Sequence, residues 1–481
     1  MKKLFLSNIF LILTLNLIAK PLYVFGIDVQ IQNIVGTENY GVYFALFNFC
    51  YLFQILLDPG LQNLNTQSVS ANRELFSKQF PQILFVKSIL ATTFFFVILI
   101  FLYLFDYPPT YYKFVYLIII LQILISFLLF LRGNISSLGL YTHDVYLSAL
   151  DKLLLVIGLG YIIWFSPYKE ALTITKFLQA QILAVLVTIA VAAIILTGRS
   201  IPLHLNFTWK ETKLLLYRAF PYALVFLLMT LYTRMDGVML ERLLEDNGHE
   251  AGIYAAGFKL YDAANMIGFL FATLLLPMFS SLVKKSRELN ELVDQSLKIL
   301  MALIIPLVCL VLFYADDIMV FLYDDGSEYY AHVLRILILA FFCVALSYIF
   351  GTLITSTGKL KKMNYLFILG IALNWMLNLY LIPEYKALGA AYATLATQAV
   401  IIIGQISLAY KLTNIKIPNH TFLKIIAVLV LTVVFSYLIM RSVSAPPFLK
   451  LLVSGIISLI LSFLVGLLRL DITKESIDLD S

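Results

Sequence analysis

Charged residues are scarce in this chain. Asp, Glu, Lys and Arg together make up 13% of its 481 residues, whereas hydrophobic residues make up 61%. An average soluble domain contains about 25% charged residues. Such a shortage of charge excludes a soluble domain with one buried core, and it predicts that lipid surrounds most of the chain.

Cysteine and the motifs of soluble enzymes are also nearly absent. The three cysteines, Cys50, Cys309 and Cys343, show no CxxC or other paired spacing, which argues against disulfides and structural zinc. No two of the five histidines stand four residues apart, as a helical metal pair would. The segment GTLITSTGK at 351–359 has six residues between its glycines, and Leu360 stands where a phosphate loop needs Ser or Thr. We therefore expect no catalytic residue, metal, cofactor, nucleotide site or nucleic-acid partner.

Long apolar runs recur from one end of the chain to the other. A membrane helix needs about 20 predominantly apolar residues, so these runs predict an all-α integral membrane protein. The first run contains Lys20 and Pro21 and lacks a small-residue cleavage site, so we expect a retained helix rather than a signal peptide. The fourteen predicted transmembrane helices are 6–28, 39–66, 81–105, 112–132, 146–166, 172–197, 214–241, 252–282, 297–315, 331–357, 363–383, 387–410, 422–440 and 448–468.

The placement of Lys and Arg predicts the orientation of these helices. With the amino terminus in the cytoplasm, nineteen of the 34 basic residues fall in inner loops or ends and seven in outer loops or their edges. Cytoplasmic loops are enriched in Lys and Arg in this way. We therefore expect a multi-pass protein with both termini cytoplasmic.

Eight basic residues lie inside the predicted spans. Lys20, Arg234 and Lys259 lie about 10 to 15 Å from the outer edge, where reaching water is difficult. They predict either a cavity for an anionic ligand or ion pairs that lock helices together, and we favour the cavity. The other five lie nearer a membrane edge and are expected to extend to water: Lys87, Lys152, Arg218, Lys298 and Arg335.

Three aspartates are predicted to serve as ion-pair or coupling groups. Asp262 follows Lys259 by three residues on one helix face, so we expect the two to neutralise each other in the empty site. Asp236 lies two residues after Arg234 and points in another direction, so we expect it to pair with a neighbouring helix. Asp58 precedes a Pro-Gly pair that breaks a helix and frees backbone groups. It belongs either to an inner gate or to a helix cap.

A faint internal repeat divides the chain. GVYFALF at 41–47 resembles GIYAAGF at 252–258, six spans later. Because six spans preserve orientation, two six-helix lobes related by a pseudo-twofold axis would enclose a central cavity. We therefore expect an amino-terminal lobe at 1–200, a carboxy-terminal lobe at 201–413, and two further helices with a cytoplasmic tail at 414–481.

Four segments resemble a known family. Residues 233–282 combine Asp236, Gly-Ile-Tyr at 252–254 and Leu-Pro followed by two serines. The others are GTENYGVYFALFNF at 36–49, LDPGLQNLNTQ at 57–67 and ALGAAYATLATQ at 387–398. Together they resemble the oligosaccharide flippases of bacterial polysaccharide biosynthesis, within the multidrug/oligosaccharidyl-lipid/polysaccharide exporter superfamily.

This resemblance implies transport and no enzymatic chemistry. The implied activity is movement of a polyprenyl-diphosphate-linked oligosaccharide from the inner to the outer leaflet of the bacterial cytoplasmic membrane, by alternating access. The related lipid II flippases carry a base and an acid three positions later on helix 8, which Lys259 and Asp262 match, and basic residues on helix 1, which Lys20 partly matches. The implied partners are the lipid-linked oligosaccharide, membrane lipids, and polysaccharide polymerases or glycosyltransferases.

The deep cations predict how such a substrate is held. We expect Lys20, Arg234 and Lys259 to bind the diphosphate, while Asp236 and Asp262 hold these cations in the empty site. Coupling to Na⁺ or H⁺ is left open. A lipid II flippase is an alternative, although such proteins show more cavity arginines. A cation-coupled multidrug antiporter is another, although deep basic residues disfavour cationic substrates.

Overall fold

The structure is a computed structural model that describes residues 18–197, 209–283, 285–442 and 445–467. Nearly all of these residues are helical, and none of them lies in a strand. Residues 1–17, which include the first part of the predicted transmembrane helix at 6–28, and the predicted cytoplasmic tail from 468 lie outside the described residues.

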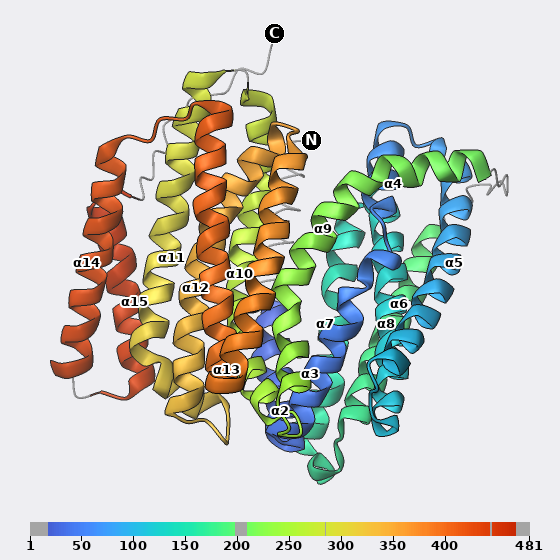
Figure 1. The fold of residues 1–481 in the computed structure, drawn as a ribbon, viewed down its shortest axis with the longest axis horizontal. Coiled ribbons are helices and arrows are strands. Elements are labelled where there is room, and N and C mark those ends of the chain that lie inside the picture. Colours follow the sequence, from blue (N-terminus) through green and yellow to red (C-terminus); the bar gives the residue numbers. More distant parts are fainter. Residues whose placement is uncertain (1–17, 198–208, 284, 443–444, 468–481) are drawn as a thin grey trace.

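The helices form two groups (Figure 1). The first group begins with a π-helix, η1 (Leu22–Asp28), that runs directly into α2 (Val29–Val35). It continues with α3 (Thr37–Leu52), η2 (Gln54–Leu56), α4 (Leu61–Ala71), α5 (Leu75–Leu104), α6 (Pro109–Ser137), α7 (Tyr141–Phe165), η3 (Lys169–Ala171) and α8 (Ile174–Thr197). The second group contains α9 (Trp209–Leu243), α10 (His249–Leu282), α11 (Ser286–Leu322), α12 (Glu328–Ser356), α13 (Leu360–Thr413), α14 (Asn419–Ser442) and α15 (Pro447–Leu464).

The prediction of an all-helical membrane protein is confirmed. Among the described residues, 11 helices are long and apolar enough to cross a membrane, and the bent pair Thr37–Leu52 and Gln54–Ala71 makes up to 12. The 54-residue α13 contains two predicted spans, because its backbone reverses at Lys386, where φ is 54° and ψ is −127°. With the first predicted helix only partly described, the fold agrees with the expected fourteen.

The predicted helix breaker after Asp58 interrupts the second span between η2 and α4. Pro59 has no backbone N–H to donate, and Gly60 adopts a φ of 85°, a conformation that glycine reaches without steric cost. The span also bends by 44° a few residues earlier, between Thr37–Leu52 and Gln54–Ala71. This bend directs the polar start of α4 away from the axis of α3.

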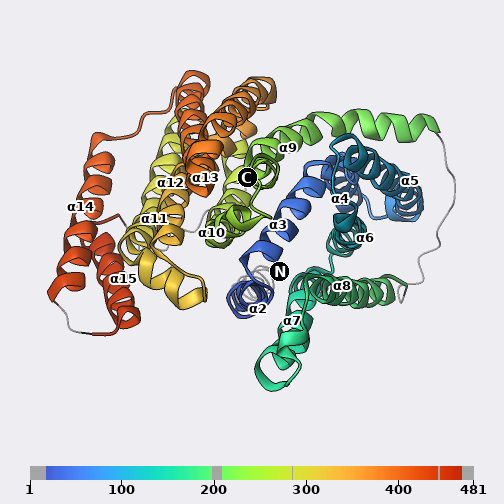
Figure 2. The same ribbon diagram turned by 60° about the horizontal axis from the view of Figure 1, so that its bottom comes forward.

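The two groups of helices touch at one end of the bundle, which we call the closed end (residues 28–41, 243–252, 322–330 and 385–387). Glycines make this contact possible. A Cβ on Gly41 would lie only 1.9 Å from the backbone oxygen of Gly248, and one on Gly252 only 2.1 Å from that of Thr37. Figures 1 and 2 show α3 and α10 beside each other here, while toward the other end α10 to α13 diverge from the first group and α9 crosses over to α4 and α5.

Hydrogen bonds reinforce the closed end. The Gln32 side chain donates to the backbone oxygen of Gly252 at 3.0 Å, and Asn33 donates to that of Leu322 at 2.9 Å. Thr37 Oγ1 donates to Asp325 at 2.8 Å. These contacts join α2 and α3 of the first group to α10 and to the loop before α12 in the second. Helices α14 and α15 pack against α11, on the side away from the first group (Figure 1).

Candidate functional site

A cavity of about 810 Å³ lies between the two groups of helices. Residues from the segment 20–28, which includes η1, and from α3, α6, α7, α9, α10 and α12 line it, and most of the lining surface is apolar. Its basic side chains are Lys20, Arg132, Lys152, Arg234 and Lys259, and its acidic side chains are Asp28, Asp144, Asp151 and Asp262. Five cations against four carboxylates leave the cavity with one net positive charge.

Lys259 is held by the first helix of the chain. Its Nζ lies 3.6 Å from Asp28 Oδ2 and donates to the Asp28 backbone oxygen at 3.2 Å and to Gln32 Oε1 at 3.0 Å. It also lies 3.7 Å from the centre of the Tyr40 ring, a cation–π contact. The side chain is 8% exposed, so this cation faces the cavity from the innermost part of the closed end.

The predicted pairing of Lys259 with Asp262 is therefore wrong. Asp262 pairs with Arg234 on α9, with 3.1 Å between the guanidinium and the carboxylate. The guanidinium is also within 5.2 Å of the Tyr51 ring centre and 5.1 Å of that of Phe258. The spacing of three residues along α10 allows an ion pair between Lys259 and Asp262. The packing of η1 and α9 against α10 instead brings Asp28 to Lys259 and Arg234 to Asp262.

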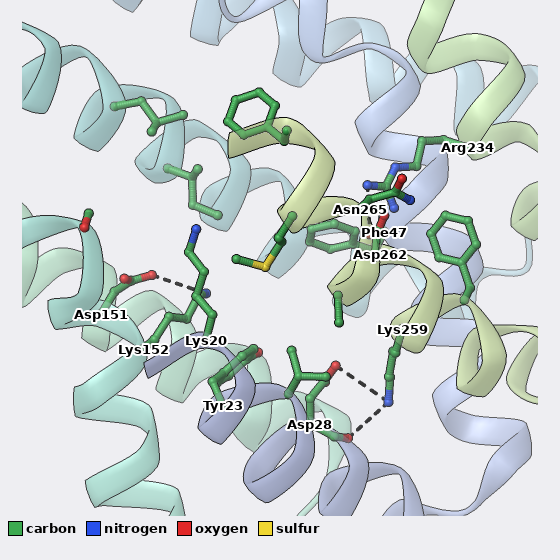
Figure 3. Close-up of a pocket in the computed structure, with 18 of the residues that line it drawn as sticks. Lys20, Tyr23, Asp28, Phe47, Asp151, Lys152, Arg234, Lys259, Asp262 and Asn265 are labelled. Atoms are coloured by element: carbon green, nitrogen blue, oxygen red, sulfur yellow. Dashed lines mark hydrogen bonds and ion pairs between the residues drawn. The ribbon is translucent and has the colours of Figure 1, made fainter. Parts of the chain in front are cut away.

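A second set of charges lines the opposite wall. Lys152 lies 3.2 Å from Asp151, and Arg132 lies 2.7 Å from Asp144. The part-buried Lys20 stands near them, and Figure 3 shows it beside Lys152, across the cavity from Lys259 and Arg234. Among the described residues, Lys20 Nζ has neither a hydrogen bond nor an ion pair.

Arg132 is one of the nineteen basic residues that the sequence placed in inner loops or ends, and Lys152 was expected to extend to water. Both instead line the cavity, because α6 and α7 pack with these faces toward the second group of helices. Asp28, Asp144 and Asp151 were not singled out at all. Their only signal was the presence of acids within or beside predicted spans, which does not distinguish a cavity from a membrane edge.

Asp236 lies outside the cavity, in a polar cluster between α9, α10 and α13. It is 1% exposed. Asn374 and Asn378 donate to its Oδ1 at 3.0 and 2.6 Å, while Tyr254, at 2.8 Å, and Thr394 donate to its Oδ2. Neighbouring helices do supply its partners, but they are neutral donors, and the expectation that Asp236 holds a cavity cation is wrong.

This arrangement gives Asp236 a distinct chemical character. No Lys or Arg among the described residues pairs with it, so four hydrogen bonds alone offset the cost of removing a carboxylate from water. Asn378 Oδ1, beside it, has no hydrogen-bond donor. A buried carboxylate can take up a proton. Together with a neighbouring amide oxygen, it also offers the oxygen ligands that small hard cations prefer.

Asp58 also lies outside the cavity. Its Oδ1 accepts the backbone N–H of Gln62 at 3.2 Å, which is the capping role that the sequence left open. Its Oδ2 lies 3.6 Å from Lys87 Nζ, and the Lys87 side chain is only 1% exposed. The expectation that Lys87 extends to water is wrong, because Leu57 O and Ser126 Oγ accept its hydrogen bonds at 3.1 and 2.8 Å.

The remaining span cations pair locally. Lys298 pairs with Asp294 one helical turn earlier, and Arg335 pairs with Asp316. Both side chains are partly exposed, as expected near a membrane edge. The side chain of Arg218 lies outside the described residues.

Comparison with known proteins identifies a family and several structures of similar fold. The family described as "Polysaccharide biosynthesis protein" matches residues 5–283. The structure is similar to the lipid II flippase MurJ in an inward closed conformation, with a TM-score of 0.65 and 16% identity over 95% of this chain and 98% of that one. It is also similar to an inward-facing multidrug resistance MATE family transporter of the MOP superfamily, with a TM-score of 0.63 and 14% identity over 82% of this chain and 95% of that one.

A third similar structure is the Vibrio cholerae MATE transporter VcmN, with a TM-score of 0.59 and 16% identity over 84% of this chain and 96% of that one. At these identities, the likeness establishes the fold alone. No curated protein matches the sequence.

Proposed function

This chain belongs to the polysaccharide biosynthesis protein family and has the fold of flippases and transporters of the MOP superfamily, and from that premise we propose that it flips a lipid-linked oligosaccharide. The substrate is a polyprenyl-diphosphate-linked glycan, which moves from the inner to the outer leaflet of the bacterial cytoplasmic membrane. The observation that carries the proposal is the positively charged cavity between the two lobes, with its deepest cations held by carboxylates.

The diphosphate binds between the two walls of the cavity. Lys20, which lacks an ion pair among the described residues, attracts it first. Lys259 and Arg234 then exchange their carboxylate partners, Asp28 and Asp262, for phosphate oxygens. Arg supplies two parallel donors, and Lys supplies a compact point charge. Each of these two cations has one anionic partner before and after the exchange. The net gain in binding free energy is therefore small, and the substrate can be released, as export requires.

The rest of the substrate divides between water and lipid. The sugars occupy the polar part of the cavity between α3 and α7, where Asn48 on α3 and Asp144 and Asp151 on α7 offer hydrogen-bonding groups. The prenyl chain stays in the bilayer. An apolar chain in the aqueous cavity would lose about 0.8 kcal/mol per CH₂ group, so the tail must leave the cavity laterally.

Alternating access then follows from the contact at the closed end. We place this end at the outer face and both termini in the cytoplasm, in agreement with the distribution of Lys and Arg. The cavity is loaded from the inner leaflet while Gly41 and Gly252 keep the lobes together. Separation of these glycine contacts and closure of the opposite end expose the substrate to the outer leaflet.

Two energy sources are available without ATP. Outward movement of one negative charge across an inside-negative membrane releases about 2.3 kcal/mol per 100 mV. The buried Asp236, which links α9 and α10 to α13, is the coupling group, and it takes up H⁺ or Na⁺ in one conformation and releases it in the other. Polysaccharide polymerases or glycosyltransferases supply or consume the substrate on either side of the membrane.

Two other cargoes remain as alternatives. The fold shared with MurJ supports lipid II, but the described lining of the cavity contains two arginines, Arg132 and Arg234, where those relatives show several. The fold shared with MATE transporters supports a cationic drug. A net positive cavity repels such a substrate, so this alternative is less favoured.

The test is transfer of a fluorescent undecaprenyl-diphosphate oligosaccharide across proteoliposomes, with and without an inside-negative potential. Lys259→Ala should abolish transfer at unchanged protein content, and Lys259→Arg should restore part of it. Lys285→Ala is the matched control, because this exposed lysine pairs with Glu288 outside the cavity. Equal transfer by wild type and Lys259→Ala would remove Lys259 from the site, and transfer of cationic drugs alone would favour the antiporter.

A further inference from the structure

A second groove lies away from the central cavity, between the two halves of α13. It has a volume of about 410 Å³ and nearly entirely apolar walls. Leu366 and Leu369 on the first half face Gly404 and Leu408 on the second. A Cβ on Gly404 would lie 2.6 Å from Leu366 Cδ2, so the glycine lets the two halves approach closely at the floor of the groove.

Two lysines stand at the same end of this groove. Lys362 and Lys411 lie 24 residues before and 25 residues after the backbone reversal at Lys386. At 1.5 Å per residue, both are about 36 Å from the reversal, and therefore at one level of the membrane. Since Lys386 pairs with Glu250 at the closed end, the two lysines lie at the opposite end, which we assign to the cytoplasmic side.

Both lysines are available for a ligand. They are exposed, and neither side chain makes an ion pair or hydrogen bond among the residues that the structure describes. Tyr365, which also lines the groove, is 73% exposed, and Leu369 is 52% exposed. An apolar groove facing the bilayer and ending between two free cations at the membrane edge requires a ligand that is hydrocarbon at one end and anionic at the other.

We propose that this groove binds an anionic phospholipid of the inner leaflet, such as phosphatidylglycerol, with its phosphate between Lys362 and Lys411 and an acyl chain along Gly404. A soluble anion would leave the apolar walls uncovered. A second copy of the chain in a twofold contact would bring the same two lysines against each other, and this repulsion disfavours a dimer here. The site is separate from the substrate cavity and does not depend on the cargo.

The position of the groove gives the lipid a structural consequence. The same two halves of α13 carry Asn374, Asn378 and Thr394, which hold Asp236. A lipid that bridges Lys362 and Lys411 holds the two halves of α13 at a fixed separation at their cytoplasmic end, on the cytoplasmic side of this cluster. The lipid therefore stabilises the hairpin on which the coupling group depends.

The test is native mass spectrometry and thermal unfolding of the full-length protein with added phosphatidylglycerol or phosphatidylcholine. Wild type should retain phosphatidylglycerol preferentially and unfold at a higher temperature with it. At roughly fivefold affinity per lysine near an anionic headgroup, Lys362→Ala/Lys411→Ala should bind about 25-fold more weakly. Ser407→Phe, which adds bulk in the groove without changing charge, should also lose the lipid.

Lys361→Ala is the matched control, because this lysine is exposed beside Lys362 but does not line the groove. It should retain phosphatidylglycerol as wild type does. Equal loss in the control and the double variant would show general surface attraction and overturn the site. Equal retention of both lipids by wild type, or retention by Ser407→Phe, would also overturn it. A dimer that dissociates in Ser407→Phe would assign the groove to a second copy.

Discussion

Spacing along α10 predicts Asp262 as the partner of Lys259, whereas tertiary packing gives Asp28. A double-mutant cycle can measure which of the two carboxylates interacts with Lys259. The changes are Lys259→Met and Asp28→Asn, which remove each charge with little change in volume. At 3.6 Å and an effective dielectric constant of about 20, the Coulomb attraction is about 4 to 5 kcal/mol before desolvation. Side-chain exposures of 8% and 15% mean that water screens part of it.

We therefore expect a coupling free energy of about 1.5 to 3 kcal/mol between Lys259 and Asp28. The measurement is the free energy of unfolding in mixed detergent–SDS micelles for wild type, both single variants and the double variant. A parallel cycle with Lys259→Met and Asp262→Asn should give below about 0.5 kcal/mol, since no direct contact joins these two residues. The reasoning is refuted if the Asp262 cycle gives the larger value.

Three further predictions concern the remaining features. Asp236→Asn should make transport insensitive to an imposed H⁺ or Na⁺ gradient, because it removes the buried charge; an unchanged gradient dependence would leave Asp236 a purely structural role. Lys87→Met should destabilise the protein by about 1 to 3 kcal/mol, because it leaves the buried acceptors Leu57 O and Ser126 Oγ without their donor, whereas the exposed Lys285→Ala should cost less than about 1 kcal/mol by the same unfolding assay. Gly252→Val should force the two groups of helices apart at the closed end, which spin-label distances across that end would report. Gly158→Val is the control and should leave these distances unchanged, because a Cβ there meets no atom within 4 Å. Equal distances in both variants would contradict the proposed role of the glycine contact.

The class of the protein was predictable because membrane insertion depends on composition and length along the chain. A run of about 20 apolar residues identifies a membrane helix without knowledge of its neighbours. The break after Asp58 was equally local, since proline and glycine act on their own backbone. For the same reason Asp58 itself was recognised as a potential helix cap, which its contact with Gln62 bears out.

The cavity was only half predictable. Lys20, Arg234 and Lys259 were identified because a deep cation is costly in lipid wherever its neighbours are, and all three line the cavity. Arg132 was assigned to an inner loop and Lys152 to the membrane edge, since position along the chain gives depth but not the direction that the side chain faces.

Hydrophobicity and charge along the chain thus established a multi-helical membrane protein with buried cations, because each of those properties is a sum over neighbouring residues. The pairing of those cations was decided only by the tertiary structure. Asp28 reaches Lys259 across 231 residues of sequence, and Asp236 finds its four donors on α10 and α13 rather than on α9. The attraction between two charges in a low-dielectric interior depends on their distance in space, and helix packing sets that distance.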